Sequence, residues 1–246
     1  SDWFVSGFNK GEVERIGVPD RDNVVFRSVR KFLNCDYKKM NVFDAGCGFG
    51  EKSVPFVEKG CRVVGVEPLV WRAKIASGKI TGEVINTTIE QVLDDSEFVG
   101  RNSFDLAIFF CVLEFCEDPL KVLLALRSVM KEGGVVYITT GLFQNRNVLQ
   151  EAFYGVIRNT FNSYSLDLLL KRAGYEVVAS QLVGKNIQVV ARKAEAISVG
   201  ALQKVIDSGK RDEELKIIAR HLYRELGLGN SFRPYELKTH WRGNQR

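Results

Sequence analysis

The fold of this chain is decided by residues 41–50, Asn41-Val42-Phe43-Asp44-Ala45-Gly46-Cys47-Gly48-Phe49-Gly50. The first half is a short apolar run of the kind that forms a buried strand, and the second half is a glycine-rich loop. Glycines at such a turn let the backbone bend sharply and approach a flat ligand closely. We therefore predict a strand over residues 41–45, a ligand-binding loop, and a helix that continues to about Lys59.

Beyond this stretch, short β-branched runs alternate with amphipathic ones, which predicts βαβ units and a parallel sheet. We expect the remaining elements at the following places: strands at residues 62–66, 83–86, 104–110 and 135–139, a helix opened by Asp118-Pro119 and ended by Glu132-Gly133-Gly134, a helix capped by Ser165 and stopped by Gly174, and a hairpin of residues 175–183 and 186–191 around Gly184. The predicted fold is an α/β, Rossmann-like sheet of seven mostly parallel strands that ends in an antiparallel hairpin.

Two segments flank the predicted ligand-binding domain of residues 41–193. Residues 1–40 are expected to hold a helix at about 22–33, and Phe4 and Phe8 could help this segment close over the ligand as a lid. Residues 194–246 are expected to be a helical extension. Its apolar stripe, Leu215, Ile218, Leu222 and Leu226, suits packing on the domain or on a second copy in a homodimer.

The end of the chain combines basic and aromatic residues. Between residues 232 and 246 there are four cations and three aromatic side chains: Arg233, Lys238, Arg242, Arg246, Phe232, Tyr235 and Trp241. Such a mixture can bind single-stranded nucleic acid by neutralisation and stacking. A solvated tail is the alternative interpretation.

Composition excludes several other classes of protein. The chain has 246 residues, 45% of them hydrophobic and 26% charged, with a formal net charge of +5. No apolar run approaches the roughly 20 residues of a membrane span, and the N-terminus lacks the features of a signal peptide. The five cysteines lack zinc-finger spacing, and the two histidines, His221 and His240, lie near the C-terminus. We expect a cytoplasmic protein with no metal site and no membrane partner.

The residues around the glycine loop indicate the charge of its ligand. A dinucleotide-binding loop would have glycine at the position of Glu51, because a carboxylate there faces the pyrophosphate unfavourably. Asp44 instead places an acid two residues before the first glycine. This suits a ligand that carries an ammonium and a sulfonium.

With these motifs the sequence resembles the class I S-adenosylmethionine-dependent methyltransferases, in particular their UbiE/UbiG-like "methyltransferase type 11/12" branch. The resemblance covers roughly residues 40–192. It rests on five blocks in the right order: residues 44–50, residues 64–68 (Val-Gly-Val-Glu-Pro), residues 104–115, residues 131–136, and residues 164–175. It implies S-adenosylmethionine as the cofactor.

The resemblance also implies roles for individual residues. Gly46, Cys47, Gly48 and Gly50 would pass beneath the methionine and ribose of the cofactor. Asp44 would hold the methionine ammonium, through water, and Glu67 would accept both ribose hydroxyls with Pro68 beside it. The adenine would contact Thr88 and Ile89, and the sulfonium would lie near Phe110 and Cys111.

The catalytic base is not evident from the sequence. Many relatives have histidine where this chain has Cys111 or Phe115. A hydroxyl substrate would need Glu114, Tyr154 or Tyr164 as base, with Glu114 and Tyr164 as our candidate catalytic residues. Alternatively, the nucleophile is already reactive, as a carboxylate or amine is, or the extension delivers His221 or His240.

Three functions remain open at this point. The favoured one is O-methylation of a small molecule such as a sugar or secondary metabolite, since residues 141–163 are rich in Asn, Phe and Tyr. The second is an RNA methyltransferase that uses the basic tail. Phe110-Cys111-Val112-Leu113 stands where amino-group nucleic-acid methylases have an Asn/Asp-Pro-Pro-Tyr motif, which counts against base N-methylation. The third is a non-catalytic subunit of the same fold.

Overall fold

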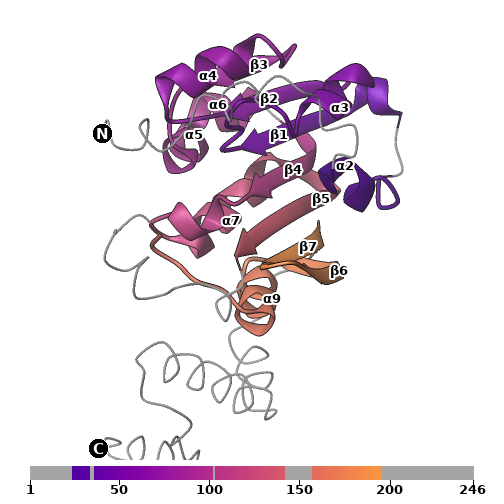
Figure 1. Ribbon diagram of the computed structural model, residues 1–246, viewed down its shortest axis with the longest axis vertical. Helices are drawn as coiled ribbons and strands as arrows, with labels where there is room; N and C mark the ends of the chain where they lie inside the picture. Colours follow the sequence, from indigo (N-terminus) through magenta and orange to yellow (C-terminus); the bar gives the residue numbers. More distant parts are fainter. Residues whose placement is uncertain (1–23, 34–35, 102, 142–156, 195–246) are drawn as a thin grey trace, which may run out of the picture.

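The computed structural model describes residues 24–33, 36–101, 103–141 and 157–194. These residues form one seven-stranded sheet in the order β3-β2-β1-β4-β5-β7-β6 (Figure 1). Neighbouring strands are parallel from β3 to β5, and β7 is antiparallel to both β5 and β6. The strands are β1 (Asn41–Ala45), β2 (Arg62–Val66), β3 (Glu83–Ile85), β4 (Phe104–Phe110), β5 (Met130–Gly141), β6 (Tyr175–Val183) and β7 (Asn186–Lys193).

Helices lie on both faces of this sheet. The described helical segments are α2 (Val24–Val29), η2 (Tyr37–Lys39), α3 (Val54–Glu58), α4 (Val70–Ser77), α5 (Ile89–Asp94), α6 (Ser96–Arg101), η3 (Leu113–Phe115), α7 (Pro119–Val129) and α9 (Ser163–Arg172). Buried side chains of α5, α6, α7 and α9 pack against one face in the larger core cluster. Those of α2, α3 and α4 pack against the other face. The fold is therefore the three-layer, Rossmann-like arrangement that the sequence predicts.

The strand order places a crevice at one edge of the sheet. The chain runs from β1 outward through β2 to β3, then crosses to β4 on the other side of β1. Loops that leave β1 and β4 therefore diverge, and in α/β sheets ligands bind where such loops part, beyond the carboxyl ends of the strands. In Figure 1 the arrowheads of β1 and β5 point to this edge, whereas α2 lies towards the opposite one.

Most predicted strand bounds are confirmed. β5 and β7 each end two residues later than expected, at Gly141 and Lys193, and three further details are wrong. β3 ends at Ile85, so Asn86 lies beyond it. α7 ends at Val129 and β5 begins at Met130, so Glu132-Gly133-Gly134 do not end a helix. These residues lie instead in an irregular part of β5, because its pairing with β4 jumps from Phe104–Met130 to Leu106–Val135.

The cap of α9 is the third correction. Asn162, not Ser165, is the N-cap, and its side-chain oxygen accepts the Ser165 N–H at 2.7 Å. Ser165 occupies the third helical position and returns the bond, since its hydroxyl accepts the Asn162 N–H at 3.0 Å. This reciprocal pair is a capping box.

Several sequence predictions lie outside the described residues. They are the lid residues Phe4 and Phe8, residues 142–156 of the segment rich in Asn, Phe and Tyr, including Tyr154, the two histidines His221 and His240, the helix stripe of residues 215–226, and the basic tail. Within the described ranges, no helix is long and apolar enough to cross a membrane, and no group of three or more metal-ligating side chains occurs.

Candidate functional site

A pocket of about 310 Å³ opens beyond the carboxyl ends of β1, β2 and β4. It lies where the strand order predicts a ligand site. The residues that line it come from the glycine loop, the end of β2, the start of α5 and the loop after β4: Gly46, Val66, Glu67, Pro68, Leu69, Arg72, Thr88, Ile89, Glu90, Cys111, Val112, Phe115 and Cys116. Six predicted cofactor residues are thus brought together: Gly46, Glu67, Pro68, Thr88, Ile89 and Cys111.

Glu67 is the best-defined acid of this pocket. It follows β2 directly and is only 4% exposed. One carboxylate oxygen accepts the Gly48 N–H at 3.1 Å and the other accepts the Leu69 N–H at 3.0 Å. A carboxylate has about four lone-pair positions, so roughly two remain for further donors. Glu67 can therefore accept two ligand hydroxyls while it stays bonded to the loop.

Asn86 is a residue that the sequence analysis missed. It follows β3, and its side-chain amide donates to the carbonyl oxygens of Glu67 (2.8 Å) and Pro68 (3.0 Å). These bonds tie the end of β2 to the end of β3. An Asn after a short strand was a visible signal, but the sequence prediction placed it inside the strand.

The glycine loop needs its glycines for two different reasons. Gly46 and Gly48 both have positive φ, 62° and 56°. A Cβ on Gly46 would lie 2.6 Å from Val112 Cγ2, whereas a Cβ on Gly48 would meet no protein atom within 4 Å. Gly46 thus allows close packing against the loop after β4. Gly48 leaves open space beside the Glu67 carboxylate.

Asp44 lies behind the loop. It is 1% exposed, and the Ser53 hydroxyl donates to its Oδ2 at 2.6 Å. Burial raises the pKa of Asp44 to about 7, a rise that the Ser53 bond and the nearby Lys52 oppose and Glu67 reinforces. Asp44 does not line the pocket, so a role in holding the cofactor's ammonium would require an intervening group, as the sequence analysis expected.

The Cys47 side chain points into the core. It is buried, and its sulfur lies 2.8 Å from the position that a Cβ on Gly65 would take. Burial raises the pKa of this thiol, followed in effect by the charges of Asp44 and Glu67, so the thiol is neutral. Any contact of Cys47 with the cofactor would involve its backbone.

The Gly50 backbone continues the left-handed geometry of the loop, with φ 80°. A Cβ there would touch the backbone of Ala76 in α4 at 3.4 Å. Gly50 therefore lets the loop pack closely on α4. It does not line the pocket.

Thr88 and Ile89 line the pocket at the start of α5. The Thr88 hydroxyl accepts the Gln91 N–H at 3.3 Å and is the N-cap of this helix. This bond uses one acceptor position of the hydroxyl, which keeps its O–H donor for a ligand. Ile89 is 7% exposed and offers an apolar surface.

Phe110 is the last residue of β4 and Cys111 follows it, and only Cys111 lines the pocket. Cys111 has φ 57°, the one described non-glycine residue with positive φ, and its N–H donates to the Thr139 carbonyl at 2.8 Å. It lines the pocket, as expected for a residue near the sulfonium. Phe110 does not line it; its ring lies 4.7 Å from Lys52 Nζ on the side of the sheet that α3 covers.

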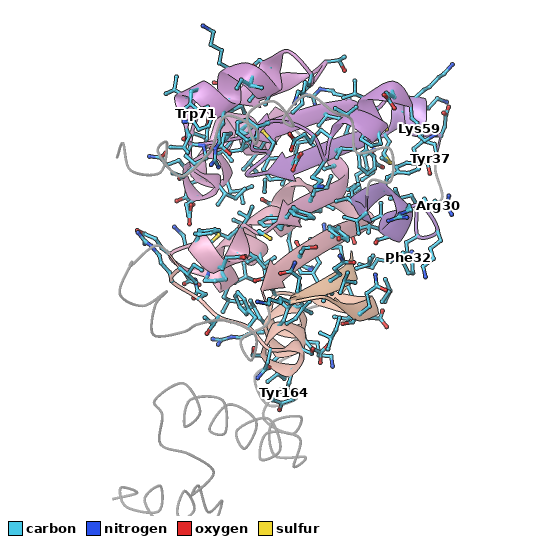
Figure 2. All side chains as sticks on the ribbon, in the orientation of Figure 1. Arg30, Phe32, Tyr37, Lys59, Trp71 and Tyr164 are labelled. Carbon is cyan, nitrogen blue, oxygen red and sulfur yellow. The ribbon has the colours of Figure 1, made fainter. Side chains whose placement is uncertain are left out.

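The structure does not bring the two candidate catalytic residues into the pocket. Glu114 is 1% exposed in η3, and its backbone carbonyl accepts the N–H groups of Arg158 and Asn159. Tyr164 lies on α9 at the far end of the molecule from β2 and α4 (Figure 2). Neither side chain lines the pocket. Their catalytic role stays a prediction.

Arg72 lines the pocket and is another residue that the sequence did not indicate. It lies on α4, with its guanidinium 5.4 Å from the ring centroids of both Phe49 and Trp71. These two rings are themselves 5.3 Å apart. The three side chains form a cluster next to the glycine loop, which depends on the packing of α4 and has no local sequence signal.

Comparison with known families decides what this pocket serves. A family model described as "Methyltransferase domain" matches residues 19–180, which is more than half of the chain. The chain belongs to the methyltransferase domain family. Its fold and its matches identify it as a class I S-adenosylmethionine-dependent methyltransferase, and S-adenosylmethionine is the cofactor of this class.

Two curated methyltransferases illustrate the range of relatives. The chain is 32% identical over 123 residues to a ubiquinone biosynthesis O-methyltransferase of Bradyrhizobium sp. (strain ORS 278), a match to 50% of this chain and 46% of that protein. It is 25% identical over 222 residues to a tRNA U34 carboxymethyltransferase of Campylobacter jejuni, a match to 83% of this chain and 73% of that protein. The chain spans less than half the length of the first curated relatives that it matches.

Solved methyltransferase structures share the fold. A SAM-dependent methyltransferase from Aquifex aeolicus aligns with a TM-score of 0.57 at 18% identity, over 76% of this chain and 100% of that one. A second, from Mesorhizobium loti, aligns with a TM-score of 0.55 at 17% identity, over 70% and 99%. At this identity the likeness establishes the architecture alone.

The pocket of this methyltransferase fits the cofactor. The Glu67 carboxylate retains acceptor capacity for a pair of hydroxyls, and Pro68 and Ile89 offer apolar surface beside it. Gly48 itself does not line the pocket, although its N–H holds the Glu67 carboxylate. These features suit a ribose and a flat base.

Proposed function

We propose that this chain transfers the methyl group of S-adenosylmethionine to an oxygen atom of a small molecule. The observation that carries the proposal is Glu67, a buried carboxylate that lines the pocket and has both oxygens oriented by backbone N–H groups. Such an acid binds the ribose of an adenosyl donor through charge-assisted bonds. The curated O-methyltransferases among the relatives support oxygen as the acceptor.

The residues of the pocket have different roles in the proposed methyl transfer. When bound, S-adenosylmethionine supplies an electrophilic methyl group on a sulfonium. Glu67 orients the donor, and Val112, Phe115 and Cys116 give the pocket an apolar lining. Alignment and exclusion of water are the main contributions that a protein makes to this type of transfer.

The acceptor oxygen is proposed to be acidic, as in a carboxylic acid or a phenol. Among the described residues that line the pocket, the acids are Glu67 and Glu90, and no histidine occurs. Glu67 is engaged by the loop, and Glu90 Oε1 accepts the Glu117 N–H at 3.1 Å. A carboxylic acid is already ionised at neutral pH and needs no base from these residues. A phenol, with a pKa of about 10, ionises far more readily than a sugar hydroxyl, which would need a base.

A second candidate is methylation or a related modification of RNA. The match to the tRNA U34 carboxymethyltransferase extends over more of this chain than the match to the ubiquinone O-methyltransferase does. The same experiment separates the two functions.

The test uses purified protein and methyl-labelled S-adenosylmethionine. The acceptors are a panel of aromatic carboxylic acids, phenols and sugars, and total tRNA in a separate reaction. We expect label in a carboxylic acid or phenol. Glu67→Gln should raise the KM for the cofactor about 10- to 100-fold, the value of a lost charged hydrogen bond. Glu176→Gln, at an exposed position on β6, should leave it unchanged.

The other outcomes each have a meaning. Label in tRNA alone would replace the proposal by the RNA function. Binding of S-adenosylhomocysteine with no transfer to any acceptor in the panel or in a host extract would indicate a non-catalytic subunit.

A further inference from the structure

A second pocket lies on the face of the sheet that α2 covers. It has a volume of about 520 Å³, within the range of small-ligand sites, and is formed by α2, the residues just after it, and the middle of β5, β7 and β6. None of its lining residues lines the cofactor pocket. Figure 2 shows Arg30, at this pocket, and Trp71, beside the cofactor pocket, on opposite sides of the molecule.

Three cations form one wall of this pocket: Arg27, Arg30 and Lys31. They lie at positions i, i+3 and i+4, and the helical bonding continues to Arg30, whose N–H donates to the Phe26 carbonyl at 3.0 Å. Arg27 lies in α2, Arg30 and Lys31 lie in the turn just after it, and all three side chains line the same pocket. Among the described residues that line this pocket there is no aspartate or glutamate.

The floor of the pocket is polar although it is buried. Gln188 is 6% exposed, and its Oε1 accepts a hydrogen bond from Gln181 Nε2 at 2.9 Å. Tyr137 is fully buried, and its hydroxyl oxygen accepts the Thr139 hydroxyl at 2.8 Å. Burial raises the pKa of Tyr137, so the phenol is neutral. The floor therefore adds neutral polar groups, and no charge that would oppose an anion.

We propose that this second pocket binds a small ligand that carries a phosphate group, at a site separate from the cofactor. Two guanidinium groups and an ammonium on one wall match the charge and the oxygen geometry of a phosphate. The concave shape and the polar floor favour a small molecule over a nucleic-acid backbone, which is bound by extended basic surfaces.

The test is a calorimetric titration of the full chain with inorganic pyrophosphate at about 0.15 M ionic strength, where exposed charges are screened. We expect saturable binding that persists when excess S-adenosylhomocysteine is present. Replacing the three cations (Arg27→Gln, Arg30→Gln and Lys31→Gln together) should weaken binding at least about tenfold. The control replaces three exposed lysines that line neither pocket, Lys38, Lys39 and Lys74, by glutamine, and should bind as the wild type does.

A second variant tests the pocket without changing its charge. Ser180 is an exposed residue on its rim, and Ser180→Trp would fill the space. We expect this variant to fold, because the side chain lies at the surface, and to lose pyrophosphate binding.

Three results would overturn the proposal. They are no binding of pyrophosphate to the wild-type protein, equal weakening in the lysine control, or loss of the signal on saturation with S-adenosylhomocysteine. Binding of a single-stranded RNA but not of pyrophosphate, sensitive to the three substitutions, would assign the surface to nucleic acid instead. Because the titration needs no methyl transfer, it is independent of the activity proposed above.

Discussion

Asp44 is an acid that the fold removes from water. The strand β1 carries it into the core, where one hydroxyl, that of Ser53, compensates for the lost solvent. Desolvation dominates, so the pKa rises from an ordinary value of 3.8 to about 7. Because the folded pKa is the higher one, this group stabilises the cofactor-free protein most below about pH 4, and the contribution is lost as the pH rises through about 7.

Cofactor affinity should therefore depend on pH through Asp44. Below pH 7 the carboxyl is mostly protonated, and the ligand's ammonium group favours its ionised form. We expect the affinity for S-adenosylhomocysteine, measured by calorimetry from pH 5.5 to 8.5, to rise towards pH 7 by at most about tenfold per pH unit and then to level off. Asp44→Asn should remove this dependence. Parallel curves for the two proteins would show that Asp44 does not sense the ligand.

Gly46 and Gly48 give a matched pair of substitutions. Alanine at either site pays the cost of a left-handed backbone, about 1–2 kcal/mol, but only at Gly46 does the added Cβ also strike Val112. In urea unfolding, Gly46→Ala should be the more destabilising, and Val112→Ala should partly rescue it, with a coupling energy of about 1 kcal/mol. Gly48→Ala and Val112→Ala should be additive within about 0.5 kcal/mol. Equal costs at the two glycines would argue against the Val112 contact.

The sequence predicted some site residues and missed others for a physical reason. Gly46, Glu67, Thr88, Ile89 and Cys111 directly follow strands or begin helices, so their place at the sheet edge follows from local patterns. Arg72 reaches the pocket only because α4 packs beside the loop, and Asn86 acts through bonds to another strand end. Such contacts depend on tertiary structure, which no local pattern encodes.

At the scale of the elements, the strands were easier to predict than the ends of helices. Continuous apolar runs and turn residues define β1, β2, β4 and β6, and these bounds are confirmed. The start of β5 was missed because residues 131–134 are polar or glycine, yet they continue the strand past an irregular pairing. The cap of α9 was misplaced because Asn162 and Ser165 are both good capping residues, and only the geometry distinguishes them.

The capping box of α9 predicts unequal effects of three alanine substitutions. Asn162→Ala removes the acceptor for the Ser165 N–H from a buried position and should cost about 1 kcal/mol, up to about 2. Ser163→Ala, at an exposed helical position, should change stability by less than about 0.5 kcal/mol. Ser165→Ala should lie between them in the same urea titration. A larger cost at Ser165 than at Asn162 would reverse the assignment of the cap.

At the scale of the whole molecule, Arg127 joins three elements that are distant in sequence. From α7, its Nη1 donates to the carbonyl of Gly174 after α9 and to that of Ala194 after β7, the latter at 2.7 Å. Its guanidinium also lies 5.8 Å from the centroid of the Tyr175 ring. One side chain thus holds the closing hairpin against the helical layer.

Removing the Arg127 guanidinium should destabilise the fold more than removing the exposed ammonium of Lys121 from the same helix, α7. Arg127→Met keeps the aliphatic stem but loses two charged hydrogen bonds, and we expect a loss of about 1.5–3 kcal/mol in the free energy of unfolding. Lys121→Met breaks the exposed ion pair with Asp94, at 3.1 Å, and should cost less than about 1 kcal/mol. Chemical unfolding followed by circular dichroism measures both. Equal values would mean that Arg127 acts only as a surface charge.

The hydrogen bonds that hold Glu67 and Asn86 in place affect the free energy of cofactor binding. A free glutamate side chain loses up to about 1.5–2 kcal/mol of rotamer entropy when it is fixed. Here the Glu67 carboxylate is already fixed during folding by the N–H groups of Gly48 and Leu69. The Asn86 amide fixes the Glu67 carbonyl in the same way. The donor therefore meets a receptor that is rigid beforehand, and more of the contact energy at its ribose is retained as affinity.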